Sequence, residues 1–225
     1  MADTLTEGLI NINGDSVQTL EIIFLTTMIM LIPIIVVMMT SFTRYVIALS
    51  FLRNAMGTQQ TPPNMVLIGI ALFLTLFTMS PVIDQISTEA YTPYVNEEIT
   101  QAEFFSRAQV PLKRFMARNT ETSSFSLYCG LAGEQTPATV EEAVELPIQV
   151  LTPAFATSEL KKAFEIGLLL YIPFLLIDII VSSTLMSMGM VMLPPAMIST
   201  PFKLLLFITL NGWELLFSTL VHSIK

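Results

Sequence analysis

Four long stretches with almost no charged side chains constrain the fold of this sequence more than any other feature. They are residues 22–43, 54–83, 166–202 and 204–221. The first two carry no charge, the third carries only Asp178, and the fourth carries only Glu214. A helix needs about 20 mainly apolar residues to cross the hydrocarbon core of a membrane. We therefore predict an all-α, integral membrane-type protein with two long apolar helical hairpins.

Composition supports this fold class and argues against several others. Hydrophobic residues make up 53% of the 225 residues and charged residues only 12%, about half the usual charge of a soluble domain. A disordered chain is too poor in apolar residues to match. The net charge of -8 argues against nucleic-acid binding, so no nucleic-acid partner is expected.

Catalysis is equally poorly supported. One Cys and one His are too few for a structural zinc site. The sequence contains no P-loop, dinucleotide fingerprint or hydrolase motif. We therefore expect no enzyme, no catalytic residue, no metal and no cofactor.

Charge also divides the chain, taken as one unit of residues 1–225, into four segments. An N-terminal segment (1–21) precedes the first apolar hairpin (22–83). An acidic helical insert (84–165) then separates it from the second hairpin (166–221). We expect the insert to be small, helical and extra-cytoplasmic.

Basic residues set the expected orientation. The connection within the first hairpin carries Arg44 and Arg53 and no acid, and the connection within the second carries Lys203. The positive-inside rule places both connections in the cytoplasm and both termini outside. Binding of Arg44 and Arg53 to anionic headgroups or a cytoplasmic partner is the alternative. No cleavable signal peptide is evident at the acidic N-terminus.

Local signals predict helices within the insert. An apolar stripe in residues 97–119 has helical spacing and is interrupted at Pro111. A short helix is expected after Thr139. Ser158 is expected to cap a further helix that leads into the third apolar stretch.

Asp178 stands alone in an apolar stretch and requires a partner. An unpaired carboxylate there costs roughly 2.5–3.5 kcal/mol on insertion scales. Candidate partners are Lys203, Arg44 or a neighbouring subunit. Asp178, Lys203 and Glu214 are therefore candidates for intramembrane polar contacts that pack subunits together. A proton-sensitive element is the less favoured interpretation of Asp178.

A methionine alternation at residues 186–192 is the most distinctive local pattern. Met186, Met188, Met190 and Met192 are each separated by one residue. Residues two apart point to nearly opposite sides of a helix, so this spacing forms a stripe only on extended backbone. Copies of such a loop around an axis would form a deformable apolar ring, because methionine is flexible and polarizable. A Met-rich, lipid-facing helix is the open alternative.

Six segments, in chain order, carry a family resemblance. They are MMTSFTR (38–44), LRNAMGTQQTPPN (52–64), ALFLTLFTMSPVID (71–84), TSELKKAFEIG (157–167), IPFLLIDIIVSSTLMSMGMVMLPP (172–195) and PFKLLLFITLNGWELL (201–216). Together they closely resemble the FliP family, the flagellar members of the type III secretion export gates. The match spans essentially residues 17–222.

The resemblance implies a partner set and a place in the cell. Family members assemble with copies of themselves and with FliQ-like and FliR-like subunits into a helical gate. FlhA/FlhB-like export components, rod proteins, unfolded flagellar substrates and membrane lipids are the further partners expected. The gate lies in the bacterial inner membrane at the flagellar basal body, with much of the chain on the periplasmic side. The family's methionine loop forms a gasket, and Met186, Met188, Met190 and Met192 fall on it.

Two hypotheses about function follow. The first is a non-enzymatic pore-forming subunit of the flagellar export gate, which passes unfolded proteins across the inner membrane and nucleates the rod. The alternative is an ion-coupled small-solute transporter that uses Asp178. Four spans are few for such a transporter, and the sequence shows no pair of broken helices framing a shared site.

Overall fold

The computed structural model describes residues 9–12, 15–58, 60–190 and 192–225. The chain divides into two compact units, residues 1–37 and residues 38–225. The first unit contains two short strands, β1 (Leu9–Ile12) and β2 (Asp15–Gln18), and most of helix α1 (Thr19–Met39). The strands pair antiparallel, with Leu9 opposite Gln18.

This short hairpin adds two strands to a fold that is otherwise all-α, as predicted. Residues 9–12 and 15–18 form strands, whereas the other regular elements of the described residues are helical. An Asn-Gly pair between two short alternating runs is a typical signal for a hairpin. The apolar stretches dominated the pattern, so this weaker local signal was missed.

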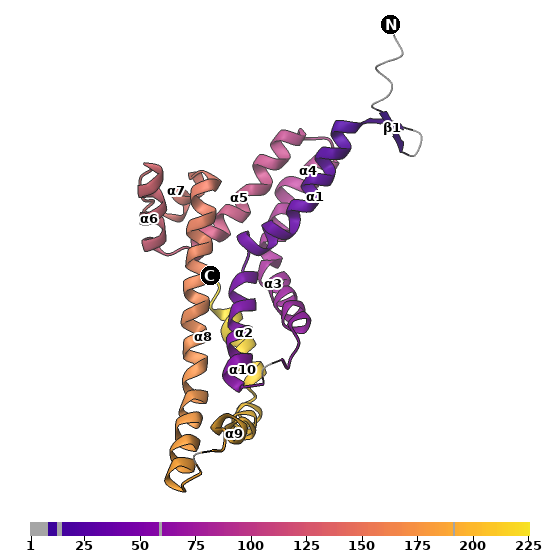
Figure 1. Cartoon of the computed structure of the whole chain (residues 1–225). Helices are drawn as coiled ribbons and strands as arrows, with labels where there is room; N and C mark the ends of the chain where they lie inside the picture. The colour runs from indigo at the N-terminus through magenta and orange to yellow at the C-terminus, as the bar shows by residue number, and fades with distance from the viewer. Residues whose placement is uncertain (1–8, 13–14, 59, 191) are drawn as a thin grey trace. The chain divides into compact units, whose positions relative to one another are not determined.

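The second unit is helical. Its elements are α2 (Phe42–Met56), α3 (Asn64–Ile86), the π-helix η1 (Ser87–Tyr91), α4 (Thr92–Val95), α5 (Gln101–Asn119), α6 (Thr122–Ala132), α7 (Val140–Glu145), α8 (Ile148–Ser187), α9 (Pro195–Thr209) and α10 (Gly212–His222). The 40-residue α8 runs the length of this unit, and α2 lies alongside it. Helices α5, α6 and α7 gather at its N-terminal part, while α9 packs against its C-terminal part (Figure 1).

Two clusters of buried side chains form the core. One joins α5, α6, α7 and the start of α8 around Phe115 and Phe155, whose rings meet edge to face at 5.8 Å. The other joins α2, α3, α8, α9 and α10 around Leu49, Leu52 and Phe174. Helices α2 and α8 approach closely at Gly167, where an added Cβ would lie 2.6 Å from Phe51.

The membrane-type helices of the prediction are present in part. Two helical segments are long and apolar enough to cross a membrane, Asn64–Val95 and Ile148–Ser187. Two further candidates are pairs of shorter helices; in one, α9 and α10 bend by 66° at their junction. Only 11% of the most apolar window of α8 is buried, so most of this surface needs cover from lipid or other chains.

Three local predictions have different outcomes. Thr139 caps α7 as expected, accepting a bond from the Glu142 N–H at 3.2 Å. Pro111 does not interrupt α5, which continues from Gln101 to Asn119. Ser158 is not a cap: it lies inside α8, fully buried, and accepts a bond from the Glu121 N–H. Residues 148–157 extend this helix upstream because their apolar side chains pack into the core.

Candidate functional site

The methionine segment joins α8 to α9. Helix α8 ends at Ser187, and Gly189 follows with φ of 75°. This left-handed conformation is typical of the glycine that ends a helix. The N–H groups of Gly189 and Met190 donate to the carbonyls of Met186 and Leu185, each at 3.0 Å. The glycine therefore stops the helix in the middle of the methionine alternation.

The four predicted methionines share exposure rather than one conformation. Met186 lies on the last turn of α8, whereas Met188, Met190 and Met192 follow it in the loop. Their exposed fractions are 66%, 63%, 41% and 98% in chain order. Large apolar side chains are normally covered, so this loop presents an unusual amount of exposed sulfur-containing surface.

A polar contact between the methionine loop and the middle of α8 holds α8, α9 and α2 together. Lys203 Nζ lies 2.6 Å from Asp178 Oδ2 and donates to the carbonyl of Ala55 at 3.1 Å. The Ser199 hydroxyl donates to Asp178 Oδ1 at 2.6 Å. Both carboxylate oxygens of Asp178 are thus engaged, and one of its predicted partners, Lys203, lies in the same chain.

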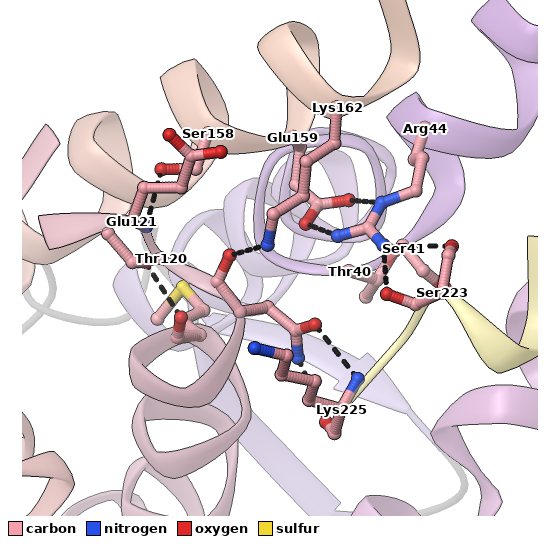
Figure 2. A network of polar contacts seen from close by, with 12 residues as sticks. Thr40, Ser41, Arg44, Thr120, Glu121, Ser158, Glu159, Lys162, Ser223 and Lys225 are labelled. Atoms are coloured by element: carbon pink, nitrogen blue, oxygen red, sulfur yellow. Dashed lines mark hydrogen bonds and ion pairs between the residues drawn. The ribbon is translucent and has the colours of Figure 1, made fainter. Parts of the chain in front are cut away.

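A second ion pair lies deeper, between α2 and α8. The Arg44 Nε donates to Glu159 Oε2 at 2.8 Å, and a second bond joins Nη2 to Oε1. Neither side chain is exposed. The Arg44 Nη1 also donates to the carbonyl and hydroxyl oxygens of Ser223, at 2.6 and 3.0 Å. Figure 2 shows both the Glu159 and the Ser223 contacts of this guanidinium.

This position corrects the expectation that Arg44 belongs to the basic connection within the first hairpin, because Arg44 lies on helix α2 and is buried. Arg44 shares the buried face of α2 with Ala48 and Leu52, at helical spacing, and that face packs against α8. Its guanidinium is therefore inside the core, paired with Glu159, and not available to lipid headgroups or a cytoplasmic partner.

Further contacts in Figure 2 tie the last residues to α5 and α8. Lys162 Nζ donates to the Asn119 carbonyl at 2.6 Å. The Asn119 side chain exchanges bonds of 3.1 Å with the backbone of Lys225. Nearby, Lys161 Nζ lies 2.6 Å from Glu121, and its hydrogen bond lowers the pKa of that carboxyl below its ordinary value of 4.5.

Sequence reasoning missed Glu159, Asn119 and Ser223. A signal for Glu159 was available: it follows Leu151 and Phe155, both buried, at four-residue spacing on one face of α8. A carboxylate on such a face needs a partner. No comparable signal marks Asn119 or Ser223, because their contacts join residues more than 100 positions apart.

The remaining predicted residues lie elsewhere. The Arg53 Nη1 donates to Asn64 Oδ1 at 2.5 Å and to the Pro62 carbonyl at 3.3 Å, joining the end of α2 to the start of α3. Glu214 is exposed on the first turn of α10 and takes part in none of the ion pairs of the described residues. Within that part of the chain, no group of three His, Cys, Asp or Glu residues could hold a metal ion.

Comparison with known proteins shows the family. The model of the FliP family matches residues 25–220. The chain belongs to the FliP family. It is 48% identical over 210 residues to the flagellar biosynthetic protein FliP of Aquifex aeolicus, covering 93% of this chain and 87% of that one. The Bacillus subtilis FliP is 46% identical over 92% of both chains, and the Pectobacterium carotovorum FliP is 49% identical over 92% and 78%.

FliP membership confirms the resemblance and gives the chain a role at a coarse level. The chain is a component of flagellar biosynthesis and export, and its apolar helices indicate a place in the inner membrane. FliP proteins are export-apparatus components and are not known as enzymes.

Proposed function

We propose that this FliP-family chain is a pore-forming subunit of the flagellar type III secretion export gate. It would act with copies of itself and with FliQ and FliR, pass unfolded flagellar proteins across the inner membrane and nucleate the rod. One observation carries the proposal: four exposed methionines lie at a helix end and loop that an ion pair and two hydrogen bonds support.

The gating action that we propose is steric. Methionine side chains are unbranched and rotate about three bonds, so a ring of them adapts to an irregular object. Met188 and Met190 of several copies would close the ring at rest and move aside for an unfolded chain. An apolar constriction also opposes the passage of hydrated ions, because it offers them no replacement for water.

The contact between Asp178 and Lys203 would keep the loop at a fixed height in the ring. It joins α8 to α9 a few turns before the loop, and Lys203 also reaches the Ala55 carbonyl of α2. A salt bridge with this much burial restricts the relative movement of its helices. The loop can then deform while the helices that carry it stay in place.

Neighbouring subunits would cover the long apolar surface of α8. Its exposed apolar side chains include Leu168, Leu169, Leu176, Ile179 and Ile180. A surface of this kind marks contact with lipid or protein. We propose that copies, FliQ and FliR cover it, that residues 84–165 lie on the periplasmic side, and that FlhA/FlhB-like components and rod proteins meet the assembled gate.

The test is a triple substitution, Met186, Met188 and Met190 to alanine, in cells with a functional flagellum. We expect small ions or solutes to leak across the inner membrane while export continues, measured by loss of membrane potential and by secreted flagellin. A matched control replaces three exposed methionines outside the loop, Met30, Met65 and Met197. The control should not leak.

Two outcomes would contradict the proposal. A loop variant that stays tight and only fails to assemble would make the loop a packing element. Solute flux by the purified chain alone in liposomes, lost on Asp178→Asn, would instead support the ion-coupled transporter. Neither result is compatible with a gasket built from several copies.

A further inference from the structure

A pocket of about 330 Å³ lies between α3, α5 and the last residues of the chain. Its basic side chains are Arg114, Arg118 and Lys225, and no acidic side chain lines it. The chain has only 10 basic residues and a net charge of -8. Three of those 10 therefore gather around one pocket in a protein that is otherwise acidic.

The two arginines have no anionic partner within the described residues. The ion pairs found there involve Arg44, Lys161 and Lys203. Arg114 and Arg118 lie four residues apart on the same face of α5, so both guanidinium groups face one direction. An anion with several oxygens would satisfy them, since guanidinium groups bind phosphate by paired hydrogen bonds.

The opposite wall of the pocket belongs to α3 and combines apolar side chains with the polar Thr78 and Gln85. Phe77, Pro81 and Val82 line it. Phe73 and Phe77 are 74% and 69% exposed, and with Met65 they continue the same face of α3 at four-residue spacing away from the pocket. Gly69 lies within this face and has open space above it. The cationic pocket therefore lies at one end of an exposed apolar face of α3, formed by Met65, Phe73 and Phe77, which we call the apolar track.

The length of the track suits an acyl chain. The 12 residues from Phe77 back to Met65 rise about 18 Å along a helix. One leaflet of a bilayer has an apolar thickness of about 15 Å, half of the hydrocarbon core. A soluble phosphate or an acidic peptide would fill the cationic pocket but would leave this track uncovered.

We infer that this pocket binds the phosphate of an anionic phospholipid, with the acyl chains of that lipid lying along α3. The proposal is independent of the pore function, because the pocket lies in the half of the unit that contains α5, away from the methionine loop. Arg114 and Arg118 supply the charge contacts, and Phe73 and Phe77 supply the apolar ones.

Binding is tested on the full chain purified in an uncharged detergent. The probes are dioleoyl phosphatidylglycerol, the zwitterionic dioleoyl phosphatidylcholine and inorganic phosphate, with retained lipid counted by native mass spectrometry. The pocket variant is R114Q/R118Q. Its control, R107Q/K161Q, removes two exposed cations that do not line the pocket. A third variant, F73S/F77S, removes the apolar contacts and keeps the charges.

The pocket variant should bind phosphatidylglycerol about 30-fold more weakly, because each basic residue near an anionic lipid contributes about 1 kcal/mol. The control should bind it as the parent chain does, and F73S/F77S should also bind it more weakly. Equal losses in the pocket variant and the control would overturn the proposal in favour of general charge attraction.

Two further results would also overturn it. Retention of inorganic phosphate as strong as that of phosphatidylglycerol, and lost in R114Q/R118Q, would show an anion site without a lipid. A change of oligomeric mass in R114Q/R118Q, with lipid binding intact, would show that the pocket meets an acidic surface of a second copy. Unchanged folding of each variant is verified by circular dichroism before binding is compared.

Discussion

Two of the ion pairs in the described part of residues 38–225 involve buried cations, and they differ in the burial of their carboxylates. Arg44 and Glu159 are both completely buried and join α2 to α8 by two parallel hydrogen bonds. Lys203 is nearly as buried, at 6% exposure, but its partner Asp178 is 32% exposed. The first pair lies in the interior of the unit, and the second joins α8 to α9 near the methionine loop.

This difference in burial predicts that the two pairs contribute differently to stability. A fully buried pair cannot lose one member without leaving a charge in an apolar interior, so it makes the fold depend on both residues. When one member of a pair is partly exposed, water can solvate its charge. Breaking such a pair therefore costs less free energy of unfolding. We therefore expect the deep pair to fix how α2 packs on α8, and we propose that the shallow pair positions the methionine loop.

Breaking the deep pair should have the largest effect. Glu159→Ala leaves the Arg44 guanidinium buried without its carboxylate and should lower the free energy of unfolding by about 3–5 kcal/mol. Denaturant titration of the purified chain in detergent, followed by tryptophan fluorescence, measures this loss. The control is the apolar pair R44M/E159L, which should recover most of the stability. A loss below about 1 kcal/mol for Glu159→Ala would show that the buried pair contributes no more than a surface salt bridge.

Breaking the shallow pair should cost less stability and act on the loop. Asp178→Asn keeps an acceptor for Ser199 but removes the charge opposite Lys203, which still donates to the Ala55 carbonyl. We expect a loss of about 1–2 kcal/mol in the free energy of unfolding, the size of a weakened charged hydrogen bond. Faster protease cleavage between α8 and α9 should accompany it. A loss as large as that of Glu159→Ala would show that the two pairs do the same work.

The exposed pair between Lys161 and Glu121 should have the smallest effect. Glu121 has a lowered pKa in the folded chain, so its contribution is complete above its ordinary value of 4.5 and is lost as the pH falls from there through the folded value. Glu121→Gln should remove that pH dependence. The measurement is the denaturant midpoint of parent and variant as the pH is lowered below about 5. Identical slopes in the two proteins would contradict the assignment.

Much of the fold was predictable from the sequence. The uncharged stretches predicted helices because an apolar run of about 20 residues has few other stable arrangements. The methionine alternation left extended backbone and a Met-rich helix as alternatives, and the structure instead has Met186 on α8 and a left-handed turn at Gly189. Asp178 had three candidate partners in the sequence, and the fold selected Lys203.

Other features required the tertiary structure. Arg44 was assigned to a basic connection because the sequence shows charge but not which face of a helix is covered. Its burial depends on Glu159, which is 115 positions away and joins it only when α8 packs on α2. Likewise, Arg114, Arg118 and Lys225 share a pocket only because the end of the chain returns to α5.

Sequence alone determined that this chain is helical, apolar and of the FliP type, because those properties follow from local composition and motifs. The tertiary structure decided which charges pair, which are left without partners, and which face of α3 stays uncovered. The physical reason is that charge pairing depends on distances between residues far apart in the chain, and local patterns carry no information about those distances.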